Sequence, residues 1–186
     1  MFENYRNDYS VIYADPPWYF KSYSKKGEGK NATQHYPCME FSDIVNLPVS
    51  QLAAQNSVLL MWVTEPFLRK SFEVIDAWDF TYKTVGFTWV KTNSKSPGIF
   101  KGTGYWTRSN PEQCLLCTKG KPKRKSRNVD EVIISPRREH SRKPDEMYGK
   151  IMELLDGPYI ELFSRTSYPG WDVWGKDVGK FDTEKK

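Results

Sequence analysis

The apolar segment 11–14 is followed by Asp15 and then by two consecutive prolines, Pro16 and Pro17. Its β-branched and aromatic residues predict a short buried strand. Proline fixes φ and donates no backbone hydrogen bond, so a strand cannot continue through the pair. The chain must therefore leave the sheet at Asp15, and residues 15–18 form a stiff turn at the strand end.

Strand and helix signals alternate along the rest of the chain. Short runs rich in Val, Ile, Leu and aromatic residues predict strands over 10–14, 57–63, 84–91, 112–118, 131–134 and 159–164. Capping and proline signals predict a short helix from Asp43 and helices over 48–55, 66–78 and 145–155. This alternation predicts an α/β domain with a largely parallel sheet flanked by helices. Ligands bind such sheets at the carboxyl ends of strands, where Asp15 and Arg165 are both expected.

Length and composition predict one domain without membrane segments. A chain of 186 residues is most simply a single domain, with a core over about 9–178 and a polar tail over 179–186. It contains no apolar stretch of about 18 residues, and its first residues lack a secretory signal. Three cysteines give no disulfide framework and fit a reducing compartment. We therefore expect a cytoplasmic protein.

The turn Asp15-Pro16-Pro17-Trp18 combines groups that suit an amino group conjugated to a planar base. The lone pair of such a nitrogen is delocalised into the ring, which makes it a poor nucleophile. The Asp15 carboxylate and the Pro16 carbonyl can each accept one N–H hydrogen bond and free that lone pair, while Trp18 offers a face for stacking. Taken alone, the same four residues also fit a rigid turn whose tryptophan packs on the core.

Basic residues gather in one part of the sequence. The span 119–143 holds ten basic and three acidic residues, a net charge of +7, which leaves −2 for the rest of a chain of total charge +5. Such segregation favours contact with nucleic-acid phosphates over a merely solvated loop. The candidates for this contact are Lys121, Lys123, Arg124, Lys125, Arg127, Arg137 and Arg138.

The cysteines do not predict a metal site. Cys114 and Cys117 have the C-x-x-C spacing, but the chain has no second pair. In a strand, residues three apart point to opposite faces, so one ion cannot collect both sulfurs. We expect two buried apolar cysteines and no metal.

Two polar segments are candidates for gates that close over a nucleic acid. The first, 19–37, is long and lysine-rich and follows the proline turn. The second, 93–105, contains Pro97, Gly98, Gly102 and Gly104.

Six stretches, in order, resemble the family of the messenger-RNA N6-adenosine methyltransferase catalytic subunit and its bacterial, phage and ciliate relatives. They cover the chain from about residue 9 to 178. The stretches are Ala14-Asp15-Pro16-Pro17-Trp18, Leu60-Met61-Trp62-Val63-Thr64, Thr88-Trp89-Val90-Lys91-Thr92-Asn93, Gly104-Tyr105-Trp106, Ser141-Arg142-Lys143-Pro144-Asp145-Glu146-Met147-Tyr148 and Ile160-Glu161-Leu162-Phe163-Ser164-Arg165.

The resemblance implies a Rossmann-like methyltransferase fold that uses S-adenosyl-L-methionine, with the catalytic motif ahead of the main cofactor segment. The implied catalytic residues are Asp15, Pro16, Pro17 and Trp18. Those implied around the base are Tyr36, Trp89, Glu112, Ser141 and Lys143. Lys91, at the end of its strand, is a further candidate that can bind phosphate or simply cap the strand. The implied cofactor residues are Asp15, Lys143, Glu161, Leu162, Phe163, Arg165 and Asp177. Lys176 replaces an asparagine that is common in the family.

These observations predict methyl transfer to the exocyclic N6 of adenine in nucleic acid, with the target base flipped out. DNA is the expected substrate, because the chain is minimal and resembles short stand-alone bacterial or phage members. N6-adenosine methylation of RNA and a non-catalytic subunit that presents nucleic acid are the alternatives. Methylation of guanine or glutamine is disfavoured, since those enzymes usually begin the motif with Asn and end it with Tyr. A monomer, a homodimer and a heterodimer with a related subunit all remain open.

Overall fold

One seven-stranded sheet, in the order β5-β3-β4-β2-β1-β6-β7, organises the chain. The structure, a computed structural model, describes residues 1–18, 39–104, 106–139 and 141–182. Within these residues the strands are β1 (Tyr9–Ala14), β2 (Ala53–Val63), β3 (Thr81–Thr92), β4 (Glu112–Lys119), β5 (Val132–Pro136), β6 (Tyr159–Leu162) and β7 (Trp171–Trp174). Neighbouring strands are parallel except that β4 runs against β2 and β3. The predicted α/β class with a largely parallel sheet is confirmed.

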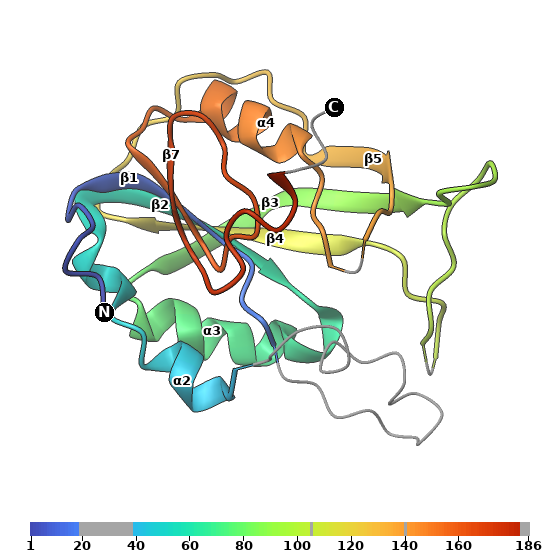
Figure 1. Ribbon diagram of the computed structural model, residues 1–186, viewed down its shortest axis with the longest axis horizontal. Helices are drawn as coiled ribbons and strands as arrows, with labels where there is room; N and C mark the ends of the chain where they lie inside the picture. The colour runs from blue at the N-terminus through green and yellow to red at the C-terminus, as the bar shows by residue number, and fades with distance from the viewer. Residues whose placement is uncertain (19–38, 105, 140, 183–186) are drawn as a thin grey trace.

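The helices cover both faces of this sheet. They are α2 (Phe41–Val45), α3 (Leu68–Ala77) and α4 (Glu146–Leu154), with 3-10 turns η2 (Val49–Gln51) and η3 (Glu65–Phe67). Figure 1 shows α4 on one side of the sheet and α2 and α3 on the other. No helix among the described residues is long and apolar enough to cross a membrane.

Alternating side chains of β1 fill the two cores that this layering creates. Ile12 packs with α2 and α3, and Tyr13 packs with α4. On β4, Cys117 belongs to the first core and Cys114 to the second, so the two cysteines lie on opposite faces of the sheet, as the strand period requires. Both thiols are buried and free.

The structure differs from the prediction at one helix and at one strand. The helix expected over 48–55 is wrong: only the short turn η2 forms, and β2 begins at Ala53 because that residue pairs with Tyr9 of β1. The strand β7 was not predicted, since its four residues follow the turn signals Pro169 and Gly170.

The order of the strands places a crevice beside Asp15. From β1 the chain passes to β2 on one side and returns much later to β6 on the other side. Such a reversal in an open parallel sheet creates a ligand crevice at the carboxyl ends of the strands. Because β4 is antiparallel, its first residue, Glu112, reaches this same edge.

Leu59→Ala tests the packing of the central strand. Leu59 on β2 is fully buried, whereas Ile134 on the edge strand β5 is 69% exposed. We expect Leu59→Ala to lower the free energy of unfolding by about 2–5 kcal/mol, because it leaves a cavity between the sheet and its helices. The matched control, Ile134→Ala, should change it by less than about 0.5 kcal/mol. Urea unfolding followed by circular dichroism measures both; similar effects of the two would contradict the assignment of the core.

Candidate active site

A pocket opens at the carboxyl ends of β1 and β6. The space between its lining residues is about 510 Å³, a figure that includes open solvent. Most of the residues that line it were predicted from the sequence. Some belong to the predicted catalytic motif and others to the predicted cofactor segment. The lining residues are Asp15, Pro17, Ser141, Phe163, Arg165, Lys176 and Asp177.

Two of these residues hold an uncommon backbone conformation. Ser141 and Phe163 both have φ of 63°, in the left-handed region that residues other than glycine rarely adopt. Such conformations persist only where the surroundings impose them, and they concentrate at ligand sites. The backbone strain at both residues therefore indicates a functional site, which their residue types alone do not indicate.

Close contact between two strand ends brings Asp177 to the pocket. A Cβ atom on Gly175 would lie 2.4 Å from the Ser164 carbonyl oxygen, so only glycine fits there. The Ser164 N–H donates to the Trp174 carbonyl at 3.0 Å. The segment after β7 therefore passes directly beside the end of β6.

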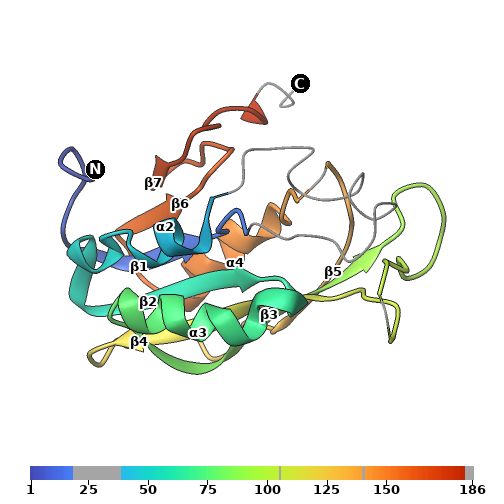
Figure 2. The ribbon, with the colours of Figure 1, turned by 90° about the horizontal axis from the view of Figure 1, so that it is seen from below.

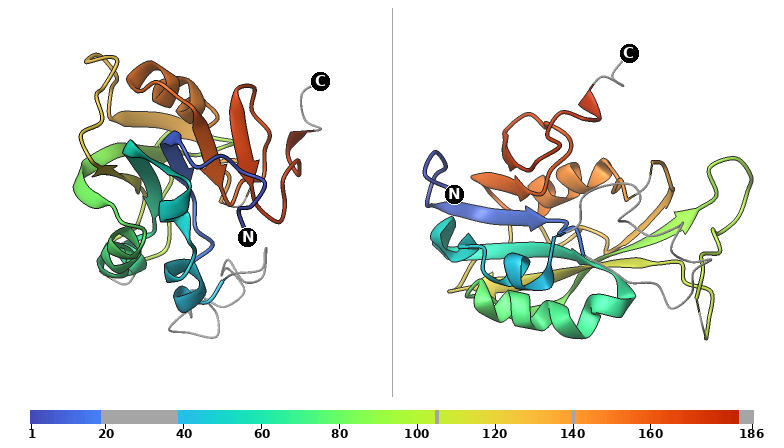
Figure 3. Two further views of the ribbon diagram at one scale, coloured as in Figure 1. Left: turned by 90° about the vertical axis from the view of Figure 1, so that its left-hand side faces the viewer. Right: turned by 60° about the horizontal axis from the view of Figure 1, so that its bottom comes forward.

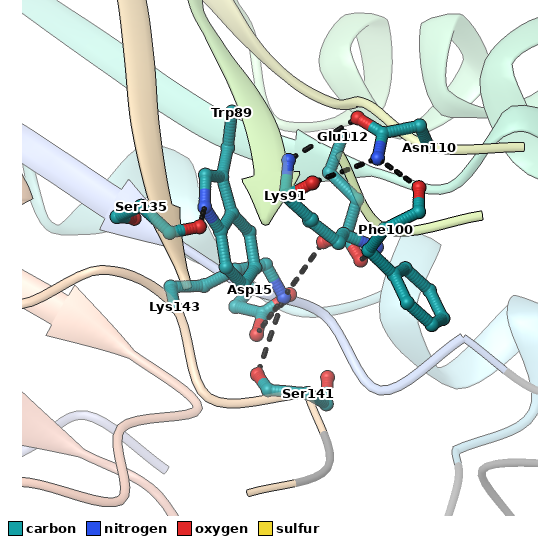
Figure 4. A network of polar contacts seen from close by, with 9 residues as sticks. All are labelled: Asp15, Trp89, Lys91, Phe100, Asn110, Glu112, Ser135, Ser141 and Lys143. Atoms are coloured by element: carbon teal, nitrogen blue, oxygen red, sulfur yellow. Dashed lines mark hydrogen bonds and ion pairs between the residues drawn. The ribbon is translucent and has the colours of Figure 1, made fainter. Parts of the chain in front are cut away.

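Four charged side chains form a chain of alternating sign beside the pocket (Figure 4). The Lys143 ammonium lies 2.7 Å from the Asp15 carboxylate and 3.3 Å from the Glu112 carboxylate. The Lys91 ammonium contacts the other Glu112 oxygen at 2.6 Å. All four side chains are largely shielded from water, which strengthens their attraction. The structure thus brings together four residues that lie far apart in the sequence.

Burial and charge act differently on the two carboxylates of this chain. Burial raises the pKa of Asp15, and the neighbouring Lys143 ammonium partly offsets that rise. Burial also opposes ionisation of Glu112, but the Lys143 and Lys91 ammonium groups outweigh it and hold the Glu112 pKa at about 2. Glu112 is therefore a fixed negative charge, whereas Asp15 is the more easily protonated of the pair.

The proline turn is a rigid part of the site. The Pro16 carbonyl accepts the Trp18 N–H at 2.8 Å, and the Pro17 carbonyl accepts the Met39 N–H at 3.1 Å. A carbonyl oxygen has two lone pairs, so Pro16 can still accept one further hydrogen bond.

The Trp18 ring does not present the open stacking face that was predicted from the sequence. The ring is 5% exposed and stacks on Phe67 with centroids 5.3 Å apart. Its indole N–H donates to the Trp62 carbonyl at 3.3 Å. Trp18 is therefore buried and anchors the turn. Phe67 of η3 stacks on its ring and so competes with any base for that ring.

Two other predicted site residues, Trp89 and Leu162, are buried. Trp89 is buried, donates its N–H to the Ser135 carbonyl at 3.2 Å and packs against the Lys91 ammonium. The Leu162 side chain is fully buried in the core. Tyr36 and the first candidate gate, over 19–37, lie outside the described residues.

Glu161 is a buried carboxylate near the end of β6. It accepts hydrogen bonds from the Tyr148 hydroxyl at 2.7 Å and from the Ser164 hydroxyl at 2.6 Å. Burial raises its pKa to about 7, even though these hydrogen bonds act to lower it. Near neutral pH the Glu161 carboxyl is therefore present in both its protonated and its ionised form.

The basic residues predicted to contact nucleic-acid phosphates are divided between two edges of the sheet. Lys119 pairs with Ser57 near the start of β2, so the segment containing Lys121, Lys123, Arg124, Lys125 and Arg127 begins at the edge opposite Asp15. It then crosses α4, where the Lys125 N–H donates to the Leu154 carbonyl. Arg137 and Arg138 follow β5 at the pocket edge. These candidates therefore lie towards two edges of the sheet, because the chain crosses the sheet within the basic span, and their contact with phosphates stays a prediction.

Arg138 and Arg137 also have structural partners. Arg138 binds the Asp145 carboxylate at 2.7 Å and donates to the Lys143 carbonyl at 3.2 Å, so it braces the loop that carries Lys143. Arg137 lies over the Phe100 ring, 4.1 Å from its centroid.

Phe181 was not among the predicted site residues. This residue lies in the stretch predicted as a polar tail, yet its ring is 9% exposed. The guanidinium groups of Arg142 and Arg165 lie 4.8 and 5.1 Å from its centroid. A lone aromatic among charged residues was the only sequence signal for this contact.

Glu161→Gln tests the buried carboxyl. Its folded pKa is raised above the unfolded value, so its ionisation costs stability progressively as pH rises from about 4.5 through 7. Glutamine resembles the protonated carboxyl and lacks this cost. We expect wild type to lose on the order of 2 kcal/mol of unfolding free energy relative to the variant between pH 5 and 8.

Urea unfolding of both proteins at pH 5, 6.5 and 8 measures that difference. Glu153→Gln, at an exposed position of α4, is the matched control and should show no such trend. A difference between wild type and Glu161→Gln that stays constant with pH would contradict the raised pKa.

Comparison with known proteins places the chain in a family. The MT-A70 family profile matches residues 9–177. A type II methyltransferase, M.MunI, of a Mycoplasma species is 34% identical over 191 residues, which cover 93% of this chain and 79% of that protein. The human N(6)-adenosine-methyltransferase catalytic subunit METTL3 is 31% identical over 179 residues, covering 91% of this chain and 28% of that protein. A putative MT-A70-like N(6)-adenosine-methyltransferase of Medicago truncatula is 33% identical, with coverage of 94% and 28%.

These matches extend over nearly the whole chain and confirm the resemblance inferred from its six motifs. The chain spans only about a quarter of the length of the plant and human relatives, but most of the length of the mycoplasma one. The chain belongs to the MT-A70 family of adenine N6-methyltransferases, whose cofactor is S-adenosylmethionine.

Proposed function

We propose that this chain methylates the N6 amino group of adenine in DNA, with the target base flipped out of the helix. The observation that carries the proposal is the position of Asp15. This carboxylate lines the same pocket as Phe163, Arg165 and Asp177, so one crevice unites the catalytic turn with the residues assigned to the cofactor.

The pocket lining suits S-adenosylmethionine. The cofactor carries a carboxylate, an ammonium, a sulfonium and ribose hydroxyls. Arg165 can pair with the carboxylate, Asp177 can accept from the hydroxyls, and Asp15 contributes negative charge towards the sulfonium. When bound, the cofactor supplies a methyl group on positive sulfur, which a neutral amine can attack.

Asp15 and Pro16 are assigned to the adenine amino group. One Asp15 oxygen, Oδ2, is held by the Lys143 ammonium, which leaves Oδ1 to accept an N6 hydrogen. The Pro16 carbonyl retains a lone pair for the second hydrogen. Two acceptors fixed in this way draw N6 towards a tetrahedral geometry and free its lone pair for the methyl group. The N6 proton becomes acidic only once the nitrogen carries the methyl group, so Asp15 acts by orientation and need not be a strong base.

DNA is favoured over RNA by the pattern of relatives. M.MunI is a type II methyltransferase, and this chain covers 79% of it. The relatives that carry the N(6)-adenosine-methyltransferase name favour RNA, but this chain covers 28% or less of those described above. RNA is therefore the second candidate substrate.

One incubation tests the reaction and the substrate together. The purified chain receives methyl-labelled S-adenosylmethionine with DNA or RNA of matched sequence, and mass spectrometry identifies the labelled nucleoside. N6-methyladenine in DNA supports the proposal, and label confined to RNA replaces DNA by the second candidate. Absence of label in both, over a broad set of sequences, would overturn the proposal.

Asp15→Asn should lower kcat for methyl transfer by about 100-fold or more, because the neutral amide donates as well as accepts and no longer orients the amine. Rates under saturating cofactor and nucleic acid measure the effect. Asp43→Asn, at an exposed position of α2, is the control. A loss of less than about threefold for Asp15→Asn would exclude the assigned role.

Glu112→Gln should lower kcat by about tenfold. Without the Glu112 charge, Lys143 has Asp15 as its only carboxylate partner in the charged chain and holds it more tightly, so Asp15 is less available to the amine. Cofactor affinity should change by less than about threefold, because Glu112 does not line the pocket. Kinetics and calorimetric titration with the cofactor separate the two quantities. Glu73→Gln on α3 is the exposed control, and an equal loss of kcat in that variant would refute this explanation.

A further inference from the structure

The connection between β3 and β4 projects beyond the edge of the sheet at which Asp15 lies (Figures 2 and 3). We call residues 93–111, apart from the undescribed residue 105, the β3–β4 arm. It holds an unusual side chain: Trp106 is 92% exposed, where a tryptophan is normally largely buried. Ile99, in the same arm, is 59% exposed. Neither residue has a role in the proposed methyl transfer.

The charge of the arm has one sign. Lys95, Lys101 and Arg108 are all exposed, and residues 93–111 include no acidic residue. An exposed aromatic ring among cations is the combination that binds single-stranded or unstacked nucleic acid, with phosphates held by the cations and a base stacked on the ring.

The arm is braced although it contains no regular strand. The Gly102 N–H donates to the Ser109 carbonyl at 2.8 Å, and the Phe100 N–H donates to the Lys91 carbonyl at 2.8 Å. Asn110 contacts both sides of the arm's base, since its amide donates to the Lys91 and Phe100 carbonyls. These bonds limit the orientations available to the arm and so to Trp106.

The base of the arm is continuous with the charged chain. Lys91 is the next-to-last residue of β3 and Glu112 is the first of β4, and their ion pair leads through Lys143 to Asp15 (Figure 4). The arm therefore leaves the fold at the two strand ends that hold the catalytic carboxylate in place.

We propose that the β3–β4 arm binds the nucleic acid next to the flipped adenine, with Trp106 stacked on a neighbouring base and Lys101 and Arg108 on its phosphates. This inference rests on the proposed function, since it assumes a nucleic-acid substrate. The proposed nucleic-acid contact lies on residues 93–111, outside the basic span 119–143. A protein partner is disfavoured because the arm that carries the two exposed apolar side chains also carries three exposed cations and no acidic residue.

The test uses the full chain with Trp106→Ala, Trp106→Phe and the double variant Lys101→Ala/Arg108→Ala. Tyr82→Ala and Lys83→Ala, exposed positions at the other end of β3, are the controls. Fluorescence anisotropy with labelled adenine-containing DNA and RNA oligonucleotides gives affinity as a function of salt. Calorimetric titration gives cofactor affinity, and sedimentation gives the oligomeric state.

We expect Trp106→Ala to weaken oligonucleotide binding by about tenfold, the loss of one stacked base, and Trp106→Phe to restore most of it. The double variant should reduce the slope of log affinity against log salt by about 2. Cofactor affinity should stay unchanged in every variant.

Three results would overturn the inference. The first is an oligonucleotide affinity that Trp106→Ala leaves unchanged, and the second is a wild-type chain that binds neither DNA nor RNA. The third is a change of oligomeric state in Trp106→Ala, which would make the arm a protein interface. Failure of the proposed function is distinguishable. If wild type methylates no adenine but the arm variants still lose oligonucleotide affinity, the reaction assignment fails and the arm stands.

Discussion

The contact between the Glu112 carboxylate and two lysines holds the site in its present form. It exists because β4 runs against its neighbours, which brings the first residue of that strand to the edge where β3 ends. A fully parallel sheet would place the start of β4 at the far edge. The single antiparallel strand is thus what allows Lys91, from one side of the sheet, to influence Asp15 through Lys143.

Much of this arrangement could be predicted from residue patterns. The proline pair ended β1 where expected, and the apolar stripe of α4 predicted its helix to within one residue at each end. The strand period also predicted that Cys114 and Cys117 lie on opposite faces. These features are local: each depends on side chains within one element and on the sheet period.

The features that escaped prediction depend on contacts between distant segments. The residues 48–55 carry a helix signal, yet pairing with β1 draws Ala53 into a strand. The burial of Trp18 depends on Phe67, about fifty residues away. The division of the basic span between two edges of the sheet also depends on such contacts, because composition contains no information about the edge at which each residue lies. All four members of the charged chain were candidate site residues, but their ion pairs could not be foreseen, since they come from four separate parts of the sequence.

Phe181 has a consequence for how the two halves of the pocket move. Its ring packs on Arg142, in the loop that carries Ser141 and Lys143, and on Arg165, which follows β6. One residue near the end of the chain thus ties the amine-side loop to the cofactor-side strand. A protein shortened before this residue would keep every group assigned to chemistry, yet the loop and the strand would lose the aromatic ring that both arginines contact.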